Sequence, residues 1–251
     1  MYSIIVVYNK KITDSQTYRA MRLQPDMDII VCDNSTIDHE NEVIVHADGY
    51  TYVPMGGNQG LSKAYNEALK KLAGKEGYVI LMDDDTLVSD HYFQCVRHAV
   101  RSGKDIYLPY VSDGSHIISP AFIDDGIVKN ADAYDSIPYQ NLTAINSGMV
   151  LNLDLFRHYR FDEGLFLDYV DHQFLTDMKH RNKQIEIMDV TIRQTFSANN
   201  FDKQKAMERF KIFKKDSAYF YRNHKQAYRY VVGKRRAHLL MMYKDPRILA
   251  L

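Results

Sequence analysis

The chain has 251 residues, of which 45% are hydrophobic and 25% are charged, so it can bury a large core and is neither disordered nor fibrous. Its 32 basic and 32 acidic side chains cancel, but residues 202–251 carry 14 basic and 4 acidic side chains, whereas residues 1–201 carry 18 and 28. An acidic body with a basic tail argues against a protein that binds nucleic acid along its whole surface.

Short apolar runs rich in β-branched residues alternate with helical patterns in the first part of the chain. This alternation predicts a parallel sheet whose strands are buried on both faces. Strands are expected at residues 3–8, 28–32, 78–82 and 106–111, with weaker candidates at 43–47 and 50–53. Helices are expected at residues 61–72 and 89–102, the second with Ser89 or Asp90 as its N-cap.

After residue 111 the alternation is lost. A hairpin and an irregular loop are expected over residues 112–140, a strand within 144–153, a helix at 168–181 and a last strand at 184–188. From residue 203 to residue 243 the chain is basic and aromatic with helical spacing, which predicts one or two terminal helices.

The strongest local signal is Asp83-Asp84-Asp85, which directly follows the apolar run at 78–82. An α/β sheet binds ligands at the carboxyl edge, where its parallel strands end. Adjacent carboxylates repel one another, and a divalent cation or a ligand hydroxyl offsets that cost. Because Asp83 and Asp85 can turn toward one site, a metal site is favoured over an acidic turn that caps the helix near Ser89.

Two other segments carry polar groups near predicted strand ends. Asp33, with Asn34 and Ser35, can accept a hydrogen bond from a base or a ribose, although this triplet is also ordinary turn chemistry. The glycine-rich loop at 56–60 precedes a predicted helix, where the backbone can approach a ligand closely. It has neither a phosphate-loop ending nor a dinucleotide fingerprint, so a plain loop-to-helix turn fits nearly as well.

Downstream, Asp168 and Asp171 lie three residues apart at a predicted helix start, so one carboxylate can face a cleft. Alternatively, Asp168 is an N-cap and Asp171 is an acid stabilised by the helix dipole. Asn146-Ser147-Gly148 interrupts an apolar run, which indicates a close approach of a ligand or another backbone, or a bulge.

Taken in order, these segments resemble glycosyltransferase family 2, the nucleotide-sugar transferases of the GT-A fold, and in particular its bacterial rhamnosyltransferase-like branch. The resemblance covers roughly residues 2–195. It is carried by Ser3–Asn9, Val31–Ser35, Gly57–Asn66, Leu81–Thr86, Asn146–Gly148 and Phe166–Asp171. It implies an α/β domain over residues 1–201, with a Rossmann-like mixed sheet flanked by helices, and a basic helical extension over 202–251.

The same resemblance implies an inverting transfer from a UDP- or dTDP-sugar to a hydroxyl of a glycan or polyprenyl-linked acceptor, as in bacterial polysaccharide biosynthesis. No covalent sugar–enzyme intermediate is needed. By carry-over, Val7 and Tyr8 line the base pocket and Asp33 recognises the base. The remaining residues expected to bind the nucleotide-sugar are Asn58, Gly60, Lys63, Asp83 and Asp84.

Metal and base roles follow from the resemblance in the same way. Asp83 and Asp85 match the outer positions of the family's D-x-D motif, so Asp83 approaches the ribose or a metal-bound water, and Asp85 binds Mn²⁺ or Mg²⁺. The metal would neutralise the leaving diphosphate. The general base is matched best by Asp171 and second by Asp168, since a fixed carboxylate can take the proton of the attacking hydroxyl.

Two positions differ from many members of the family. An acid often follows the base, where this chain has His172 and Gln173, and a metal-binding His often ends the domain, where this chain has Gln194. An amide oxygen is a weaker, uncharged ligand, so metal affinity is expected to be lower, or to rely on the diphosphate and Asp85. These differences leave a non-catalytic nucleotide-sugar-binding or scaffold protein as the alternative function.

The basic, aromatic segment 202–251 lies outside the resemblance. Its composition suits an anionic membrane surface near a lipid-linked acceptor, and it equally suits an amphipathic helix pair packed on the body or in a homodimer. No nucleic-acid partner is expected.

The setting is expected to be cytoplasmic, with contact at the inner face of the membrane as one interpretation. The two cysteines, Cys32 and Cys95, form no disulfide framework and no metal-ligand spacing. The first apolar run has no basic leader and ends too early for a signal peptide, and no stretch approaches the roughly 20 apolar residues of a membrane span.

Overall fold

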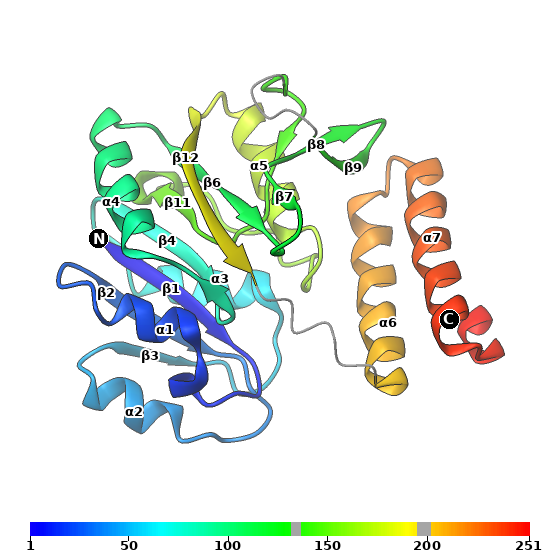
Figure 1. Cartoon of the computed structure of the whole chain (residues 1–251), viewed down its shortest axis with the longest axis horizontal. Coiled ribbons are helices and arrows are strands. Elements are labelled where there is room, and N and C mark those ends of the chain that lie inside the picture. Colours follow the sequence, from blue (N-terminus) through cyan, green and yellow to red (C-terminus); the bar gives the residue numbers. More distant parts are fainter. Residues whose placement is uncertain (132–136, 195–201) are drawn as a thin grey trace.

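A mixed sheet of nine strands lies at the centre of the computed structural model, which describes residues 1–131, 137–194 and 202–251 (Figure 1). Its strands are β1 (Tyr2–Val7), β2 (Asp28–Asp33), β3 (Thr51–Pro54), β4 (Tyr78–Asp83), β5 (Thr86–Leu87), β6 (Ile106–Ser112), β7 (Ile117–Ser119), β11 (Met149–Asn152) and β12 (Ile185–Gln194). A small antiparallel sheet beside it consists of β8 (Ala121–Asp124), β9 (Ile127–Asn130) and β10 (Leu142–Thr143).

The main sheet has the strand order β3-β2-β1-β4-β11-β6-β12-β5, and β7 pairs with β6. Strands β3, β2, β1 and β4 run parallel to one another, β11 is antiparallel to both of its neighbours, and β12 is parallel to β6. The loss of regular β/α alternation after residue 111 therefore corresponds to the point where antiparallel pairs enter the sheet.

Helices cover both faces of this sheet. One face packs against α1 (Gln16–Met21), α2 (Asn41–Ala47) and α4 (Asp90–Ala99), and the other against α3 (Leu61–Lys70) and α5 (Val170–His180). Short 3-10 turns lie at Ile12–Asp14, Val100–Ser102, Leu153–Arg157 and Pro246–Ala250. Because both faces are covered, successive strand residues are buried whichever way they point, which explains the nearly continuous apolar runs in the sequence.

Most elements expected from the sequence are present, and the candidate strand at 43–47 is wrong. Those residues belong to α2, in which Val43 is 71% exposed while Val45 is fully buried in the core. A short helix that buries one side can contain β-branched residues, because tertiary packing outweighs their modest helix penalty. Helix α1 had no counterpart among the expected elements, and Ser89 is the N-cap of α4 without a side-chain capping bond.

The register of the parallel strands places the loops after β2, β3 and β4 at one edge of the sheet. Val7 of β1 lies opposite Asp33 of β2, and Val6 lies opposite Asp83 of β4. Asp33 and Asp83 are therefore two strands apart at the same carboxyl edge, although 50 positions separate them in the sequence. The fold thus gathers the predicted ligand-binding segments at one place.

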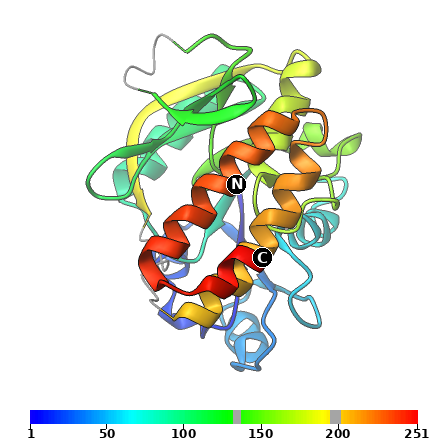
Figure 2. The ribbon, with the colours of Figure 1, turned by 90° about the vertical axis from the view of Figure 1, so that its right-hand side faces the viewer.

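Helices α6 (Lys203–Phe220) and α7 (Lys225–Tyr243) form a pair along one side of the body (Figures 1 and 2). The pair has its own small core, made of Phe210, Phe213, Val232, Leu239 and Ile248. Among the helices that the structure describes, none is both long enough and apolar enough to cross a bilayer.

We expect the aromatic cluster beneath α5 to contribute strongly to stability. Phe174 is fully buried and its ring centroid lies 5.1 Å from that of Phe161 and 5.5 Å from that of Tyr159. Phe174→Ala should lower the free energy of unfolding by about 3–5 kcal/mol in chemical denaturation, because the change leaves a cavity. Leu23→Ala, at a side chain that is 78% exposed, is the matched control and should change it by less than about 0.5 kcal/mol.

Candidate active site

The carboxylate of Asp83, at the end of β4, accepts hydrogen bonds from three side chains that come from distant parts of the chain. Asn146 Nδ2 donates to Oδ1 at 2.9 Å, while Ser147 Oγ and Gln194 Nε2 donate to Oδ2 at 2.8 Å and 2.7 Å. The polar interruption at 146–148 is therefore the turn that leads into β11 and delivers two donors to Asp83. Gly148 has a positive φ of 74°, and a Cβ there would lie 2.5 Å from Ile192 Cδ1.

Burial raises the pKa of Asp83 above its ordinary value, and the nearby charges of Asp84 and Asp171 raise it further. The hydrogen bonds from Asn146 and Ser147 act in the opposite direction. Burial raises the pKa of the Tyr65 hydroxyl, and the charges of Asp83 and Asp171 raise it further. Asn146 Nδ2 lies 2.5 Å from that hydroxyl. Asp83, Asp171 and Tyr65 therefore form one electrostatically linked group.

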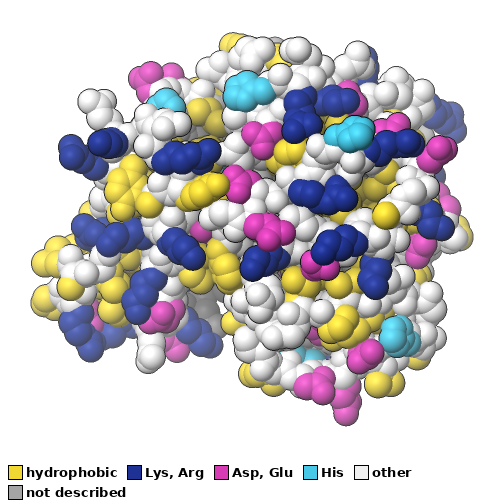
Figure 3. Space-filling view, turned by 180° about the vertical axis from the view of Figure 1, so that it is seen from behind, with side chains coloured by type: hydrophobic (Ala, Val, Ile, Leu, Met, Phe, Trp, Pro, Cys, Tyr) yellow, Lys and Arg dark blue, Asp and Glu magenta, His cyan; other side chains and the backbone are white. Residues whose placement is uncertain are grey.

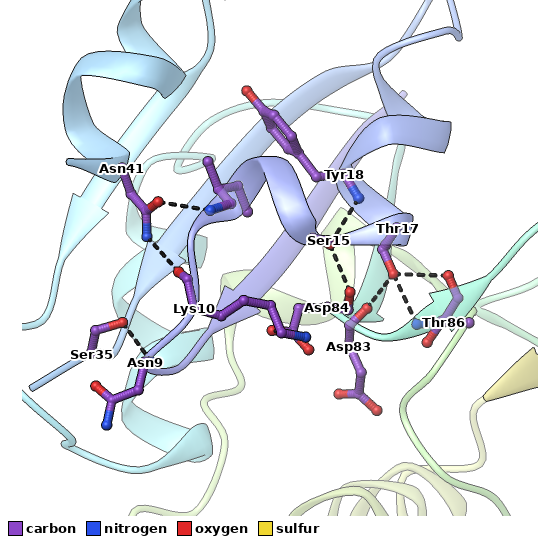
Figure 4. A network of polar contacts seen from close by, with 11 residues as sticks. Asn9, Lys10, Ser15, Thr17, Tyr18, Ser35, Asn41, Asp83, Asp84 and Thr86 are labelled. Atoms are coloured by element: carbon purple, nitrogen blue, oxygen red, sulfur yellow. Dashed lines mark hydrogen bonds and ion pairs between the residues drawn. The ribbon is translucent and has the colours of Figure 1, made fainter. Parts of the chain in front are cut away.

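The backbone of the acidic segment is held by α1 and the residue before it (Figure 4). Thr17 Oγ1 donates to the carbonyl of Asp83 at 2.6 Å and accepts from the amide of Thr86 at 3.0 Å. Ser15 Oγ donates to the carbonyl of Asp84 at 2.7 Å, and it also caps α1 by accepting from the amide of Tyr18. The turn between β4 and β5 is thus fixed at its carbonyls, which leaves the carboxylates to face other partners.

Asp84 forms an ion pair with Lys10, whose Nζ lies 2.9 Å from Oδ2 (Figure 4). Burial raises the pKa of Asp84, and Lys10 partly opposes that rise. Asp85 is half-buried in the same turn, immediately before Thr86, which pairs with Gln194 across β5 and β12. Asp85 and Gln194 therefore lie in adjoining parts of the sheet edge.

Asp33, the residue expected to recognise a base, is buried at the end of β2. Its Oδ2 accepts from Asn41 Nδ2 at 2.8 Å and from the Tyr52 hydroxyl at 3.1 Å, and its Oδ1 accepts from the amide of Ser35 at 3.0 Å. Burial and the charge of Asp33 raise the pKa of Tyr52. This carboxylate is therefore rigidly oriented by α2, β3 and the following turn.

Val7 and Tyr8 lie beside Asp33 but differ in exposure. The Val7 side chain is fully buried in the core under α1, α2 and α4, while Tyr8 is 50% exposed. Only Tyr8 offers its side chain at the surface, so a base pocket at this edge would use the Tyr8 ring and the backbone next to it.

The glycine-rich loop is tied to β2 and to a loop near the start of α5. Asn34 bridges to it, donating to Asn58 Oδ1 at 3.1 Å and accepting from the amide of Gln59 at 2.8 Å. Gly60 has a positive φ of 91°, and a Cβ there would lie 2.7 Å from the carbonyl oxygen of Phe166. The close approach that the glycine allows is therefore an approach of the protein's own backbone.

Lys63, in the first turn of α3, lines a surface cavity of about 390 Å³ together with Pro54, Met55, Gln59, Glu67 and Glu163. One lining residue, Gln59, directly follows Asn58 in the sequence. Asp83 and Asp171 are not among the lining residues.

The two carboxylates at the start of α5 have different surroundings. Asp168 is engaged by Arg209 of α6, with Nη2 2.7 Å from Oδ1. Asp171 lies in the first turn of α5, accepts from the amide of His172 at 2.8 Å, and is close enough to Asp83 to raise its pKa. His172 is packed, with Nδ1 2.7 Å from Thr143 Oγ1. Of the two, Asp171 is therefore the carboxylate that joins the group around Asp83.

Several residues of this site carry no local signal in the sequence. Thr17, Ser15 and Lys10 contact the acidic segment from positions 66 to 74 residues away along the chain. The one available cue is that Ser15 and Thr17 lie at a helix start after the first strand, where capping residues gather.

The donor atoms at this edge suit a hard divalent cation, since Mg²⁺ and Mn²⁺ prefer oxygen ligands. Asp85 supplies a carboxylate, and Gln194 Oε1 is buried with no hydrogen-bond partner among the described residues. The side chains that the structure describes contain no preformed cluster of three or more His, Cys, Asp or Glu ligands. A metal at this edge would therefore need oxygens of the bound diphosphate to complete its coordination.

Comparison with known proteins places this geometry in context. The sequence profile described as Glycosyl transferase family 2 matches residues 3–159. No curated protein matches the sequence.

Solved structures with the same fold include S. aureus TarS, with a TM-score of 0.57 and 17% identity over 86% of this chain and 39% of that chain. The chain thus spans well under half of that protein. For residues 1–349 of TarS in complex with UDP, the TM-score is 0.56 and the identity 16%, over 98% of this chain and 72% of that chain. For the mannosyltransferase PcManGT from Pyrobaculum calidifontis, in complex with GDP-Man and Mn²⁺, the TM-score is 0.61 and the identity 11%, over 99% of this chain and 77% of that chain. The predicted α/β fold of GT-A type is confirmed.

We expect the fold to be stabilised when the charge of Asp83 is removed. Its folded-state pKa is raised, so wild-type stability falls as the pH rises from the ordinary Asp value through the raised one. The Asn of Asp83→Asn can be accommodated if Ser147 and Gln194 reverse their hydrogen bonds. The variant should match the wild-type melting temperature at about pH 4 and exceed it by a few degrees at about pH 8. Calorimetric melting across this range is the measurement, and a difference that stays constant with pH would contradict the expectation.

Proposed function

Because the chain belongs to glycosyl transferase family 2, we propose that it transfers a sugar, with inversion, from a UDP- or dTDP-sugar to a hydroxyl of a glycan or lipid-linked acceptor. The observation that best supports this function is the Asp83 carboxylate at the carboxyl edge of β4, which three side-chain donors orient. Asp171 is 88 positions away in the sequence, in the first turn of α5, and its charge contributes to the raised pKa of Asp83. A donor-binding carboxylate and a base in one place are what the reaction needs.

In the proposed reaction, the carboxylate of Asp171 accepts the proton of the acceptor hydroxyl as its oxygen attacks the anomeric carbon. The bond between that carbon and the diphosphate breaks, and the nucleoside diphosphate leaves with the bonding electrons. Attack from the face opposite the leaving group inverts the anomeric configuration. Asp168 is a poorer candidate for the base, since Arg209 already neutralises it.

A divalent cation, when bound, would neutralise the charge that develops on the leaving diphosphate. Asp85 and the amide oxygen of Gln194 are the residues of this chain that would hold it. The Asp83 carboxylate already accepts three hydrogen bonds from the protein. It is therefore better suited to orienting the ribose or a metal-bound water than to coordinating the metal directly.

For the donor, the proposed roles keep the assignments made from the sequence. The Tyr8 ring and the backbone at the buried Val7 flank the base, and Asp33 recognises it. Asn58, Gly60, Lys63 and Asp84 complete the nucleotide-sugar pocket. The UDP complex of TarS supports a pyrimidine nucleotide, whereas the GDP-Man complex of PcManGT makes GDP the necessary comparison. A hexose or deoxyhexose, such as the sugar of the rhamnosyltransferase-like branch, is the proposed transferred group.

For the acceptor, we propose a growing surface polysaccharide on the cytoplasmic side of the membrane. Both cysteines are free, in keeping with a reducing setting. Lys and Arg side chains lie among hydrophobic ones over the helix pair, on the left of Figure 3. This surface suits either an anionic membrane or a second copy of the chain.

Donor binding is testable by calorimetric titration of UDP, dTDP and GDP, with ADP as control, in the presence and absence of Mn²⁺. We expect a pyrimidine diphosphate to bind more tightly with Mn²⁺. Asp85→Ala should lose that enhancement, since it lacks the metal carboxylate.

The matched control is Asp154→Ala, at an exposed carboxylate that pairs only with nearby Arg157 among its described contacts. It should bind like the wild type. If none of the pyrimidine diphosphates binds in a metal-dependent way, the assigned donor site is wrong, and a scaffold role becomes the better explanation.

The base is testable with Asp171→Asn, which keeps the size of the side chain but cannot accept the proton. We expect kcat for sugar transfer to fall by about 10²–10⁴-fold, while the Kd of the donor nucleotide changes little. Asp154→Asn serves as the control for kcat. Full turnover in Asp171→Asn would exclude Asp171 as the base.

A further inference from the structure

The loop that leads into α5 is held by a single carboxylate of the C-terminal helix pair. Asp216, in α6, accepts hydrogen bonds from three successive backbone amides: Phe166 at 2.9 Å, Leu167 at 2.8 Å and Asp168 at 2.9 Å. These residues directly precede the first turn of α5, where Asp171 lies. The carboxylate therefore fixes the backbone three residues before the proposed base.

The side chain of Asp216 is fully buried, although it is an acid on the basic helix α6. A buried carboxylate is unfavourable unless donors surround it, and three convergent backbone amides are such an arrangement. Hydrogen bonds to a charged acceptor are stronger than those between neutral groups. The pairing of Asp216 with the loop therefore constrains both partners.

A second contact from α6 acts on the same loop. Arg209 binds Asp168 through both terminal guanidinium nitrogens, Nη1 to Oδ2 and Nη2 to Oδ1, the latter at 2.7 Å. Arg235 of α7 lies in the same region, with Cζ 4.3 Å from the ring centroid of Phe213, whose ring lies 6.0 Å from that of Tyr169. The Asp168 side chain thus points toward the helix pair, and its amide points toward Asp216.

Tyr169, the N-cap of α5, is enclosed by aromatic rings of α6 and the residue after it. It has a positive φ of 65°, an uncommon conformation for a residue with a side chain. Its ring stacks on Phe220 at 4.7 Å and meets Tyr221 edge-on at 5.3 Å. The helix pair therefore supports the backbone turn at which α5 begins.

The opposite side of the loop is held by the donor-side helix. The amide of Leu61 donates to the carbonyl of Phe166 at 2.6 Å, and Ser62 Oγ donates to the carbonyl of Leu165 at 2.5 Å. The N-terminus of α3 thus takes the loop's carbonyls while Asp216 takes its amides. Removing one of these holders leaves the other in place, so the loop would shift without the fold being lost.

We propose that Asp216 is a positioning residue for sugar transfer, and that the C-terminal helix pair is a working part of the transferase because it sets the place of Asp171. This inference rests on the proposed function, in which Asp171 is the base. Asp216 does not touch the reacting atoms. A displacement of about 1 Å at a catalytic group can reduce a rate by about 10²-fold.

The test compares Asp216→Asn with the wild type in the full chain by two measurements. The Asn side chain keeps one acceptor oxygen, but its N–H groups face the backbone N–H groups that the other carboxylate oxygen bound, so we expect at least one amide of residues 166–168 to exchange hydrogen at least about 10-fold faster, while those of β4 are unchanged. We expect kcat for transfer to fall about 10–100-fold, with the Kd of the donor nucleotide within about twofold. A loss of folding would raise exchange throughout the sheet as well.

The matched control is Glu208→Gln, on the same helix, where the carboxylate is exposed and pairs with Lys211. It should change neither the exchange rates nor kcat. Arg209→Gln is the second variant, because Arg209 is partly exposed and its loss frees Asp168 without disturbing Asp216. It should lower kcat by about 10-fold at unchanged donor affinity, even if Asp216→Asn fails to fold.

Each result decides between the inference and the proposed function. If the wild type transfers sugar and Asp216→Asn exchanges faster at 166–168 without a change in kcat, the positioning role is wrong while the proposed function stands. If the exchange of those amides is unchanged, Asp216 does not hold the loop. If the wild type neither binds a donor nor transfers a sugar, the proposed function fails, and the inference fails with it.

Discussion

The carboxylate of Asp83 is the point on which the geometry of this sheet edge depends. Its partners come from the turn before β11 and from the end of β12, and its backbone carbonyl is held by Thr17 at the start of α1. Strand β11 also pairs directly with β4, so these side-chain hydrogen bonds add to the ladder between the two strands and extend the contact to β12. Because burial and neighbouring acids raise its pKa, the site is maintained at a cost to stability, as is common where function needs a charge.

Because the Asp83 carboxylate already accepts three hydrogen bonds, the three successive acids have different surroundings. Asp83 is oriented by three donors, Asp84 is paired with Lys10, and Asp85 lies next to the strand pair that ends in Gln194. The amide nitrogen of Gln194 is used on Asp83, which leaves its oxygen facing the same buried region. One side chain thereby links the orienting carboxylate to the proposed metal position.

The glycine-rich loop and the C-terminal helices are connected through the segment before α5. Gly60 lets the start of α3 approach the carbonyl of Phe166, and Asp216 binds the amides of the same segment. A donor-side loop, a base-bearing helix and the basic extension thus share one short stretch of backbone. The extension has its own small core, and it also contacts the residues just before α5 through Arg209 on Asp168 and Phe220 on Tyr169.

The sequence by itself determined the strands, most helices and the identity of the acidic segment, because buried strands and amphipathic helices impose local hydrophobic patterns. It misjudged residues 43–47, where β-branched side chains form a helix that buries only one side. Only the tertiary structure decided that Asp171 rather than Asp168 joins Asp83, that Gly60 meets Phe166, and that Asp216 holds the loop before α5. Those contacts join residues 48 to 106 positions apart, and a hydrogen bond between distant residues leaves no periodic signal in either segment.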